Sequence, residues 1–111
     1  MDTQTTLLAL TGLAQESRLA IFRLLVQAGP EGMAATRIGD ALGIAPSSMS
    51  FHLKELLHAK LVSVQRDGRS MIYAADFDAI NALVGFLTEN CCGGNVCMPT
   101  RSCQPAKKSK A

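Results

Sequence analysis

The sequence lacks tryptophan, has a single tyrosine, and contains no cysteine in its first ninety residues. No stretch approaches the roughly 18 uninterrupted apolar residues of a membrane span. Residues 1–14 also lack the basic start of a signal peptide. We therefore expect a cytoplasmic chain with no membrane partner. At 111 residues, 48% of them hydrophobic, the chain suits one small domain and is too short for a deep catalytic cleft of its own.

Charge is scarce, at 18% of residues, and it is unevenly placed. Residues 1–90 carry seven basic and nine acidic side chains, a net charge of −2, and the four basic side chains of residues 101–110 bring the whole chain to +2. Overall charge therefore does not predict a nucleic-acid binder, and any such prediction rests on where particular cations lie. We expect the basic end to be a solvated tail.

Five helical segments and one hairpin account for nearly the whole chain. Apolar spacing and stop signals predict helices over residues 3–14, 16–28, 34–42, 46–59 and 76–89. The second is apolar almost all round, which predicts a central, mostly buried helix. The order of four helices, a hairpin and a last helix predicts a mainly α fold with a small β-hairpin, the winged helix-turn-helix.

The hairpin is predicted from the dipeptide Asp67-Gly68, which separates two short apolar segments, residues 61–66 and 69–74. Asp-Gly is a strong signal for a type I′ turn, because both central residues of that turn need a positive φ. Arg66 and Arg69 would then bracket the tip.

The third and fourth helices are separated by only a few residues around Gly43, and Pro46 suits the first position of the fourth helix. On that helix Met49, Leu53 and Leu56 share one apolar face with Leu57, whereas the opposite face is small and polar. Two short helices joined by a tight turn, the second with a polar outer face, are typical of a helix-turn-helix.

These residues resemble the ArsR/SmtB family of winged-helix metalloregulators. The run LTGLAQESRLAIFRLL, residues 10–25, is similar to the family's opening segment, and SSMSFHLKEL, residues 47–56, is similar to its recognition helix. The wing, from Leu61 to Tyr73, completes a resemblance that covers about residues 7–89. Lys60 departs from the family pattern, which usually has a glycine there.

The first and last predicted helices are too apolar for the free surface of a monomer, so we predict a homodimer formed through them. The resemblance implies that this dimer binds double-stranded operator DNA. Each fourth helix would enter the major groove, the two lying about 34–36 Å apart on a palindrome. Serine and lysine side chains would donate to phosphates or base edges, and Phe51 would touch a thymine methyl group. Without the resemblance, the same face is equally typical of a solvated helix surface. The residues predicted to contact DNA are Ser47, Ser48, Ser50, Phe51, His52, Lys54, Arg66 and Arg69.

All four cysteines fall within residues 91–103, directly after the last predicted helix. Cys91 and Cys92 pair badly with each other, because adjacent Cα atoms lie about 3.8 Å apart, closer than a disulfide usually allows. We therefore expect reduced thiols and divide the chain into a winged-helix domain, residues 1–90, and a cysteine-containing segment with a basic tail, residues 91–111.

The cysteine segment resembles the C-terminal site of arsenic-responsive family members, a vicinal pair followed by a third cysteine. Soft thiolates select thiophilic centres, and trivalent arsenic or antimony takes three sulfurs. Cys91 and Cys92 are the predicted pair and Cys97 the third ligand, with Cys103 left open as its alternative. The resemblance implies no permanent cofactor. The family's zinc site across the last helix is disfavoured, because Asp76-Phe77-Asp78 lacks its histidine.

The resulting prediction is a transcriptional repressor that trivalent arsenic or antimony releases from its operator. One alternative is a repressor on the same fold that senses oxidants or persulfides with the same cysteines. The other, an enzyme with a cysteine nucleophile such as an arsenate reductase, is disfavoured, because no phosphate-binding loop adjoins the cysteines.

Overall fold

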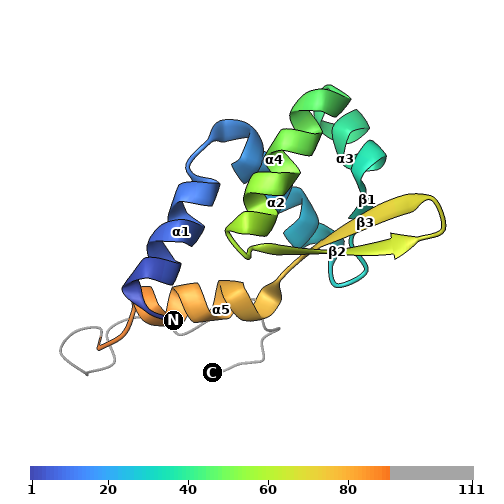
Figure 1. The fold of residues 1–111 in the computed structure, drawn as a ribbon. Helices are drawn as coiled ribbons and strands as arrows, with labels where there is room; N and C mark the ends of the chain where they lie inside the picture. Colours follow the sequence, from blue (N-terminus) through green and yellow to red (C-terminus); the bar gives the residue numbers. More distant parts are fainter. Residues whose placement is uncertain (91–111) are drawn as a thin grey trace.

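A computed structural model describes residues 1–90 of the chain as a winged helix-turn-helix, which confirms the predicted fold class. The elements are α1 (Thr3–Leu13), α2 (Glu16–Ala28), β1 (Met33–Ala34), α3 (Ala35–Leu42), α4 (Pro46–His58), β2 (Val62–Asp67), β3 (Ser70–Ala75) and α5 (Phe77–Leu87). In Figure 1, α3 and α4 lie together, the β2–β3 hairpin projects away from the body, and α1 lies beside α5 at the opposite end. None of the helices in this part of the chain is long and apolar enough to cross a membrane.

The five helices begin and end within two residues of the predicted bounds, and their N-termini fall into two groups. The side chains of Asp2, Gln15 and Asp76 cap α1, α2 and α5, each accepting from the backbone N–H three residues further on, at 2.8, 2.9 and 3.0 Å. By contrast, α3 and α4 begin without a side-chain cap, and α4 has Pro46 at its start, as predicted. The two helices of the helix-turn-helix therefore leave their first backbone N–H groups without a side-chain partner.

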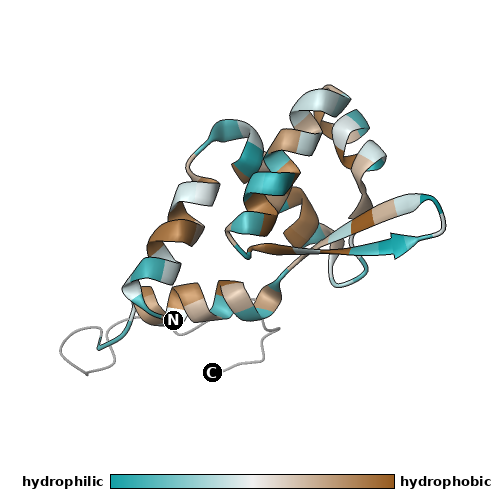
Figure 2. Ribbon diagram, in the orientation of Figure 1, coloured by the Kyte–Doolittle hydropathy of each residue, from teal (hydrophilic) through white to brown (hydrophobic). Residues whose placement is uncertain are grey.

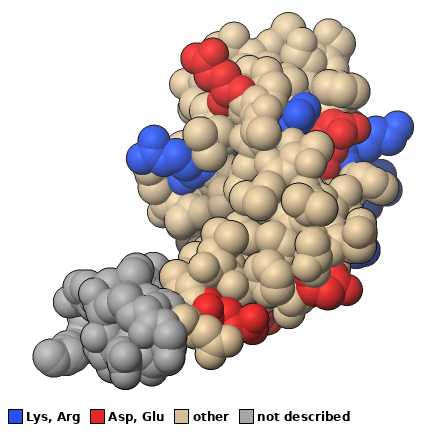
Figure 3. Space-filling view, turned by 90° about the vertical axis from the view of Figure 1, so that its left-hand side faces the viewer, with Lys and Arg blue, Asp and Glu red and all other residues tan. Residues whose placement is uncertain are grey.

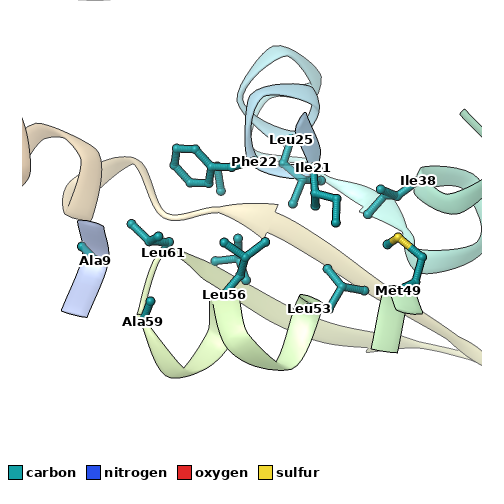
Figure 4. Close-up of a cluster of buried hydrophobic side chains, with 12 residues drawn as sticks. Ala9, Ile21, Phe22, Leu25, Ile38, Met49, Leu53, Leu56, Ala59 and Leu61 are labelled. Atoms are coloured by element: carbon teal, nitrogen blue, oxygen red, sulfur yellow. The ribbon is translucent and has the colours of Figure 1, made fainter. Parts of the chain in front are cut away.

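The hydrophobic core lies where α2, α3 and α4 meet the sheet, and Figure 4 shows side chains from all of them converging. The predicted inward residues of α4, Met49, Leu53 and Leu56, are all buried. The expectation that α2 is mostly buried holds only in part, since Ile21, Phe22 and Leu25 are buried whereas Leu19 is 45% exposed. The largest fully buried side chains are Ile21, Leu25, Ile38, Leu56 and Leu61.

The sheet has three antiparallel strands in the order β1-β3-β2, and its short strand β1 was not predicted. Met33 pairs with Tyr73, directly after Gly32, whose φ is +72°. A Cβ at Gly32 would collide with the backbone carbonyl of Tyr73, so only glycine allows the chain to approach β3 this closely. A strand of two residues is too short to show a periodic pattern, which is why it could not be predicted from the sequence.

The hairpin turn differs from the prediction by one residue. Asp67 pairs with Ser70, so the two central residues are Gly68 and Arg69 rather than Asp67 and Gly68. Gly68 has a φ of +64°, whereas Arg69 does not have a positive φ. A positive φ at the first central residue alone is the type II′ pattern, so the type I′ prediction is wrong. Arg69 consequently lies in the turn itself.

The end of α4 explains how Lys60 replaces a glycine. Lys60 has a φ of +63°, its N–H bonds the carbonyl of Leu57 at 3.0 Å, and the N–H of Leu61 bonds the carbonyl of Leu56 at 3.1 Å. These two bonds form a Schellman motif, whose left-handed residue is usually glycine. Lys60 therefore ends α4 with the backbone geometry that a glycine would adopt. Because lysine has a β-carbon, this left-handed conformation is strained.

Candidate nucleic-acid interface

The helix-turn-helix is held together by close packing at its turn. Gly43 ends α3 with a φ of +70°, and three residues later α4 begins. A Cβ at Gly39 would lie 3.0 Å from the carbonyl oxygen of Ile44 and 3.2 Å from Cγ of Met49. Glycine at this position lets α3 approach both the turn and the first inward residue of α4, which fixes the angle at which α4 is presented.

The outer face of α4 is a row of exposed side chains one helical turn apart. Ser47, Phe51, Lys54 and His58 are all exposed, and their spacing of three or four residues places them on one side of the helix. Phe51 is 55% exposed. Ser48 and Ser50 flank this row and are exposed as well. Five of the predicted DNA contacts, Ser47, Ser48, Ser50, Phe51 and Lys54, therefore lie on the accessible side of α4.

His52 differs from its neighbours because it is only half-exposed and its Nδ1 atom is shielded from solvent. Within residues 1–90 this atom has no hydrogen-bond partner. The His52 ring lies edge-on to the ring of Phe51, with centroids 5.5 Å apart and planes at 64°. Of the predicted contacts on α4, His52 is thus the one whose side chain supports a neighbour rather than projecting outward.

The wing carries the remaining predicted contacts, Arg66 and Arg69, and both are exposed. Arg66 pairs with Met71 across the hairpin, and its Nε donates to the carbonyl oxygen of Gly68 at 3.3 Å. This bond directs the Arg66 side chain toward the turn in which Arg69 lies. Two guanidinium groups are therefore concentrated at the tip of the hairpin.

A groove of about 520 Å³ separates α4 from the wing. Its floor is apolar, its α4 rim carries Ser50 and Lys54, and its strand side is formed by Met71 and Tyr73. Sequence reasoning did not identify these two β3 residues, although their alternate positions in the strand signal a shared face. Of the predicted contacts, Ser50 and Lys54 line this groove, to which α3 adds Asp40, whereas Arg66 and Arg69 lie outside its lining.

Charge is dispersed over the molecule. On the face shown in Figure 3, Lys and Arg side chains lie in small separate groups, with Asp and Glu side chains in between and at both ends. The prediction that overall charge does not mark a nucleic-acid binder agrees with this view. Among the predicted contacts in the described residues, three carry a positive charge: Lys54 on α4 and Arg66 and Arg69 on the wing.

The predicted metalloid ligands, Cys91, Cys92 and Cys97, lie outside the described residues, as does Cys103. Within residues 1–90 there is no group of three or more His, Cys, Asp or Glu side chains placed to hold a metal ion. The thiol site therefore stays a prediction from the sequence.

A tight two-helix unit, an exposed polar row on its second helix and an arginine-tipped hairpin beside it define the DNA-binding class of winged helix-turn-helix proteins. A family model described as "Helix-turn-helix domain" matches residues 13–65.

Two curated proteins resemble the chain. Nodulation protein NolR from Rhizobium meliloti is 32% identical over 80 residues, which cover 72% of this chain and 63% of NolR. The HTH-type transcriptional regulator YceK from Bacillus subtilis is 34% identical over 76 residues, covering 68% of this chain and 75% of YceK. The chain thus spans a little under two thirds of NolR and three quarters of YceK.

Solved structures share the fold. The homodimeric winged helix-turn-helix DNA-binding domain of Mb0332 from Mycobacterium bovis superimposes with a TM-score of 0.64 at 24% identity, covering 86% of this chain and 89% of that one. Solved ArsR-type regulators have the same fold. The chain belongs to the same family as YceK, the HTH-type transcriptional regulators, and it shares the winged helix-turn-helix fold of ArsR-type regulators. Its relatives and its fold are those of regulators and not of enzymes.

Proposed function

We propose that the chain is a cytoplasmic repressor that binds operator DNA as a homodimer and is released when trivalent arsenic or antimony binds its cysteines. The observation that carries the DNA-binding part is the exposed row of Ser47, Phe51 and Lys54 on α4 beside the arginine-tipped wing. With these residues and the wing guanidinium groups, we define the α4/wing face as Ser47, Phe51, Lys54, Arg66 and Arg69. This face offers hydroxyl and cationic donors to phosphates and base edges.

Dimerisation is supported by a second surface, at the other end of the domain. Leu7 and Leu10 on α1 are 51% and 39% exposed, and Val84 and Leu87 on α5 are 51% and 58% exposed. We call these four residues the α1/α5 face. The two helices contact each other, and both contain strongly hydrophobic stretches in Figure 2. An apolar surface of this kind is typical of a protein–protein interface, and a second copy presenting the same face would cover it.

The wing arginines provide the first test of DNA binding. We expect Arg69→Ala to weaken operator affinity about tenfold and to reduce the slope of log affinity against log salt by about two per dimer, because each chain loses one phosphate contact. Fluorescence anisotropy at several salt concentrations measures both. Arg23→Ala is the matched control, since it removes the same charge from an exposed position on α2. Equal effects of the two substitutions would contradict a specific role for the wing.

The thiol part of the proposal rests on donor chemistry and on position along the chain. Cys91 follows the last residue of α5 by four positions, and that helix carries Val84 and Leu87 of the α1/α5 face. Three thiolates suit a trivalent metalloid better than they suit tetrahedral zinc. A ligand bound directly after α5 is therefore adjacent, along the chain, to the proposed dimer contact, through which it would change the spacing of the two α4 helices.

Arsenite titration tests the induction mechanism. We expect native mass spectrometry of the reduced protein to show one arsenic gained and three protons lost per chain, and operator affinity to fall by 5- to 150-fold at saturation, the usual size of an allosteric coupling. Cys91→Ser and Cys97→Ser should abolish the response, whereas Cys103→Ser should retain it.

The mechanism is overturned if saturating arsenite leaves operator affinity unchanged. Release by peroxide or persulfide without an arsenite response would instead establish the thiol-redox alternative.

A further inference from the structure

Phe51 is unusual on the α4/wing face because it is the one aromatic side chain in the described residues that is classed as exposed. It lies one helical turn from Ser47 and one from Lys54, so hydroxyl and ammonium groups surround an apolar ring. Single exposed apolar residues are common and need no explanation by themselves. Here, however, the ring occupies the middle of the surface that the proposed function places against DNA.

The Phe51 ring is supported from one side by His52. The two rings meet edge to face with centroids 5.5 Å apart, and the buried Nδ1 of His52 shows that this imidazole is wedged into the body of the domain. Packed aromatic pairs of this geometry are favourable. The ring of Phe51 therefore projects from α4 in a restricted orientation, which suits a residue that has to meet one particular base.

The rest of α4 offers little direct base discrimination. Pro46–His58 contains no arginine, asparagine or glutamine, the side chains that most often make paired hydrogen bonds to guanine or adenine. Serine hydroxyls accept or donate to any base edge. The Lys54 ammonium group can donate hydrogen bonds to phosphates as well as to guanine. Among the exposed side chains of this helix, the Phe51 ring is the apolar group that can contact the 5-methyl group of thymine.

We propose that Phe51 is the specificity-determining residue of the interface and that it reads a thymine methyl group in the major groove of each operator half-site. This inference rests on the proposed function, since it requires α4 to lie in the major groove. The operator then contains a thymine at one fixed position in both half-sites. Serines and lysine anchor the helix there, and Phe51 selects the base.

Replacing thymine by uracil isolates this contact, because uracil keeps the same base pairing and lacks only the methyl group. Burying one methyl-sized group against an apolar surface corresponds to about a fourfold change in affinity. Substitution in one half-site should therefore weaken binding about fourfold, and substitution in both half-sites about fifteenfold. Thymines that Phe51 does not touch should show no effect when replaced.

The experiment begins with the full reduced chain and a randomised duplex library, from which the preferred sequence is selected. Each thymine of that duplex is then replaced in turn by deoxyuridine, and affinity is measured by anisotropy. We expect one symmetry-related pair of thymines to show the methyl dependence. Phe51→Ala should bind thymine and uracil duplexes equally, whereas Lys54→Ala should weaken both and keep their ratio. Circular dichroism melts check that each variant folds.

The outcomes separate the two proposals. A selected sequence whose affinity is indifferent to every thymine methyl group would overturn the role of Phe51 and leave operator binding intact. Methyl dependence that survives in Phe51→Ala would assign the contact to another residue and overturn the inference in the same way. Failure to enrich any sequence would overturn the proposed function together with this inference.

Discussion

The α1/α5 face and the α4/wing face are both exposed but have opposite chemistry. The α1/α5 face consists of the aliphatic residues Leu7, Leu10, Val84 and Leu87, whereas the α4/wing face combines serine, lysine and arginine with a single phenylalanine. Figure 2 shows the same contrast between the strongly hydrophobic stretches of α1 and α5 and the hydrophilic tip of the hairpin. One small domain therefore presents one surface suited to a copy of itself and another suited to a polyanion.

The two faces are joined by a direct helix contact. A Cβ at Gly12 of α1 would lie 2.7 Å from Cβ of Ala59, at the end of α4, and Ala59 is buried. The carbonyl oxygen of Gly12 also accepts a hydrogen bond from Nε of Arg18 at 2.7 Å. The helix α1, which the proposal places in the dimer interface, thus abuts the end of the helix proposed to read DNA, so displacement of α1 has to be accommodated at α4.

The largest effect is expected from a substitution that disrupts the α1/α5 face. Leu87→Glu places a charge in the proposed apolar interface, where it would be desolvated without a partner, so we expect the dimer dissociation constant to rise at least about a hundredfold. Sedimentation equilibrium measures the dissociation constant, and operator affinity should fall with it.

Ala82→Glu is the matched control for this substitution, because Ala82 is exposed on the opposite side of α5 and should leave the dimer intact. A Leu87→Glu protein that dimerises as the original chain does would show that α5 is not the interface.

A smaller effect is expected where the two faces meet. Gly12→Ala should destabilise the fold by about 1–2 kcal/mol, since overpacking against Ala59 outweighs the better helix propensity of alanine. Denaturant unfolding measures this change. The double variant with Ala59→Gly should recover part of the loss, because the two positions are in contact. Additive effects of the two substitutions would argue against a tight contact here.

The smallest expected effect lies at the end of α4. Lys60→Gly should stabilise the domain by about 0.5–1 kcal/mol and raise the melting temperature by about 3–6 °C, because glycine adopts a positive φ without strain. Lys60→Ala removes the same charge but keeps a β-carbon, so it should give no such gain. Equal melting temperatures for the two variants would mean that Lys60 stores no backbone strain.

The sequence predicted those features of the fold that follow from apolar periodicity and strong stop signals. Met49, Leu53 and Leu56 are buried as expected, and Pro46 starts α4. Features set by contacts between distant segments were missed. The strand at Met33 depends on the approach of Gly32 to β3, and no local pattern encodes that approach.

In the predicted interface, too, local sequence patterns predicted some features, whereas others depend on contacts between distant segments. Exposure of Ser47, Phe51 and Lys54 follows from helical spacing alone, whereas the half-buried position of His52 depends on packing around α4. The hairpin was predicted from its dipeptide, yet pairing of Asp67 with Ser70 moved the turn by one residue and placed Arg69 in it. The burial of one face of the strands sets their register, and that register determines which residues form the turn.

The central claim is that two chains together present two α4 helices to one duplex, and a hydroxyl-radical footprint on the selected sequence tests it most directly. The account predicts two protected patches centred one helical turn apart, about 10–10.5 base pairs, and loss of both patches with Leu87→Glu at protein concentrations where the original chain is bound. A single protected patch, or two patches that persist in Leu87→Glu under those conditions, would contradict it.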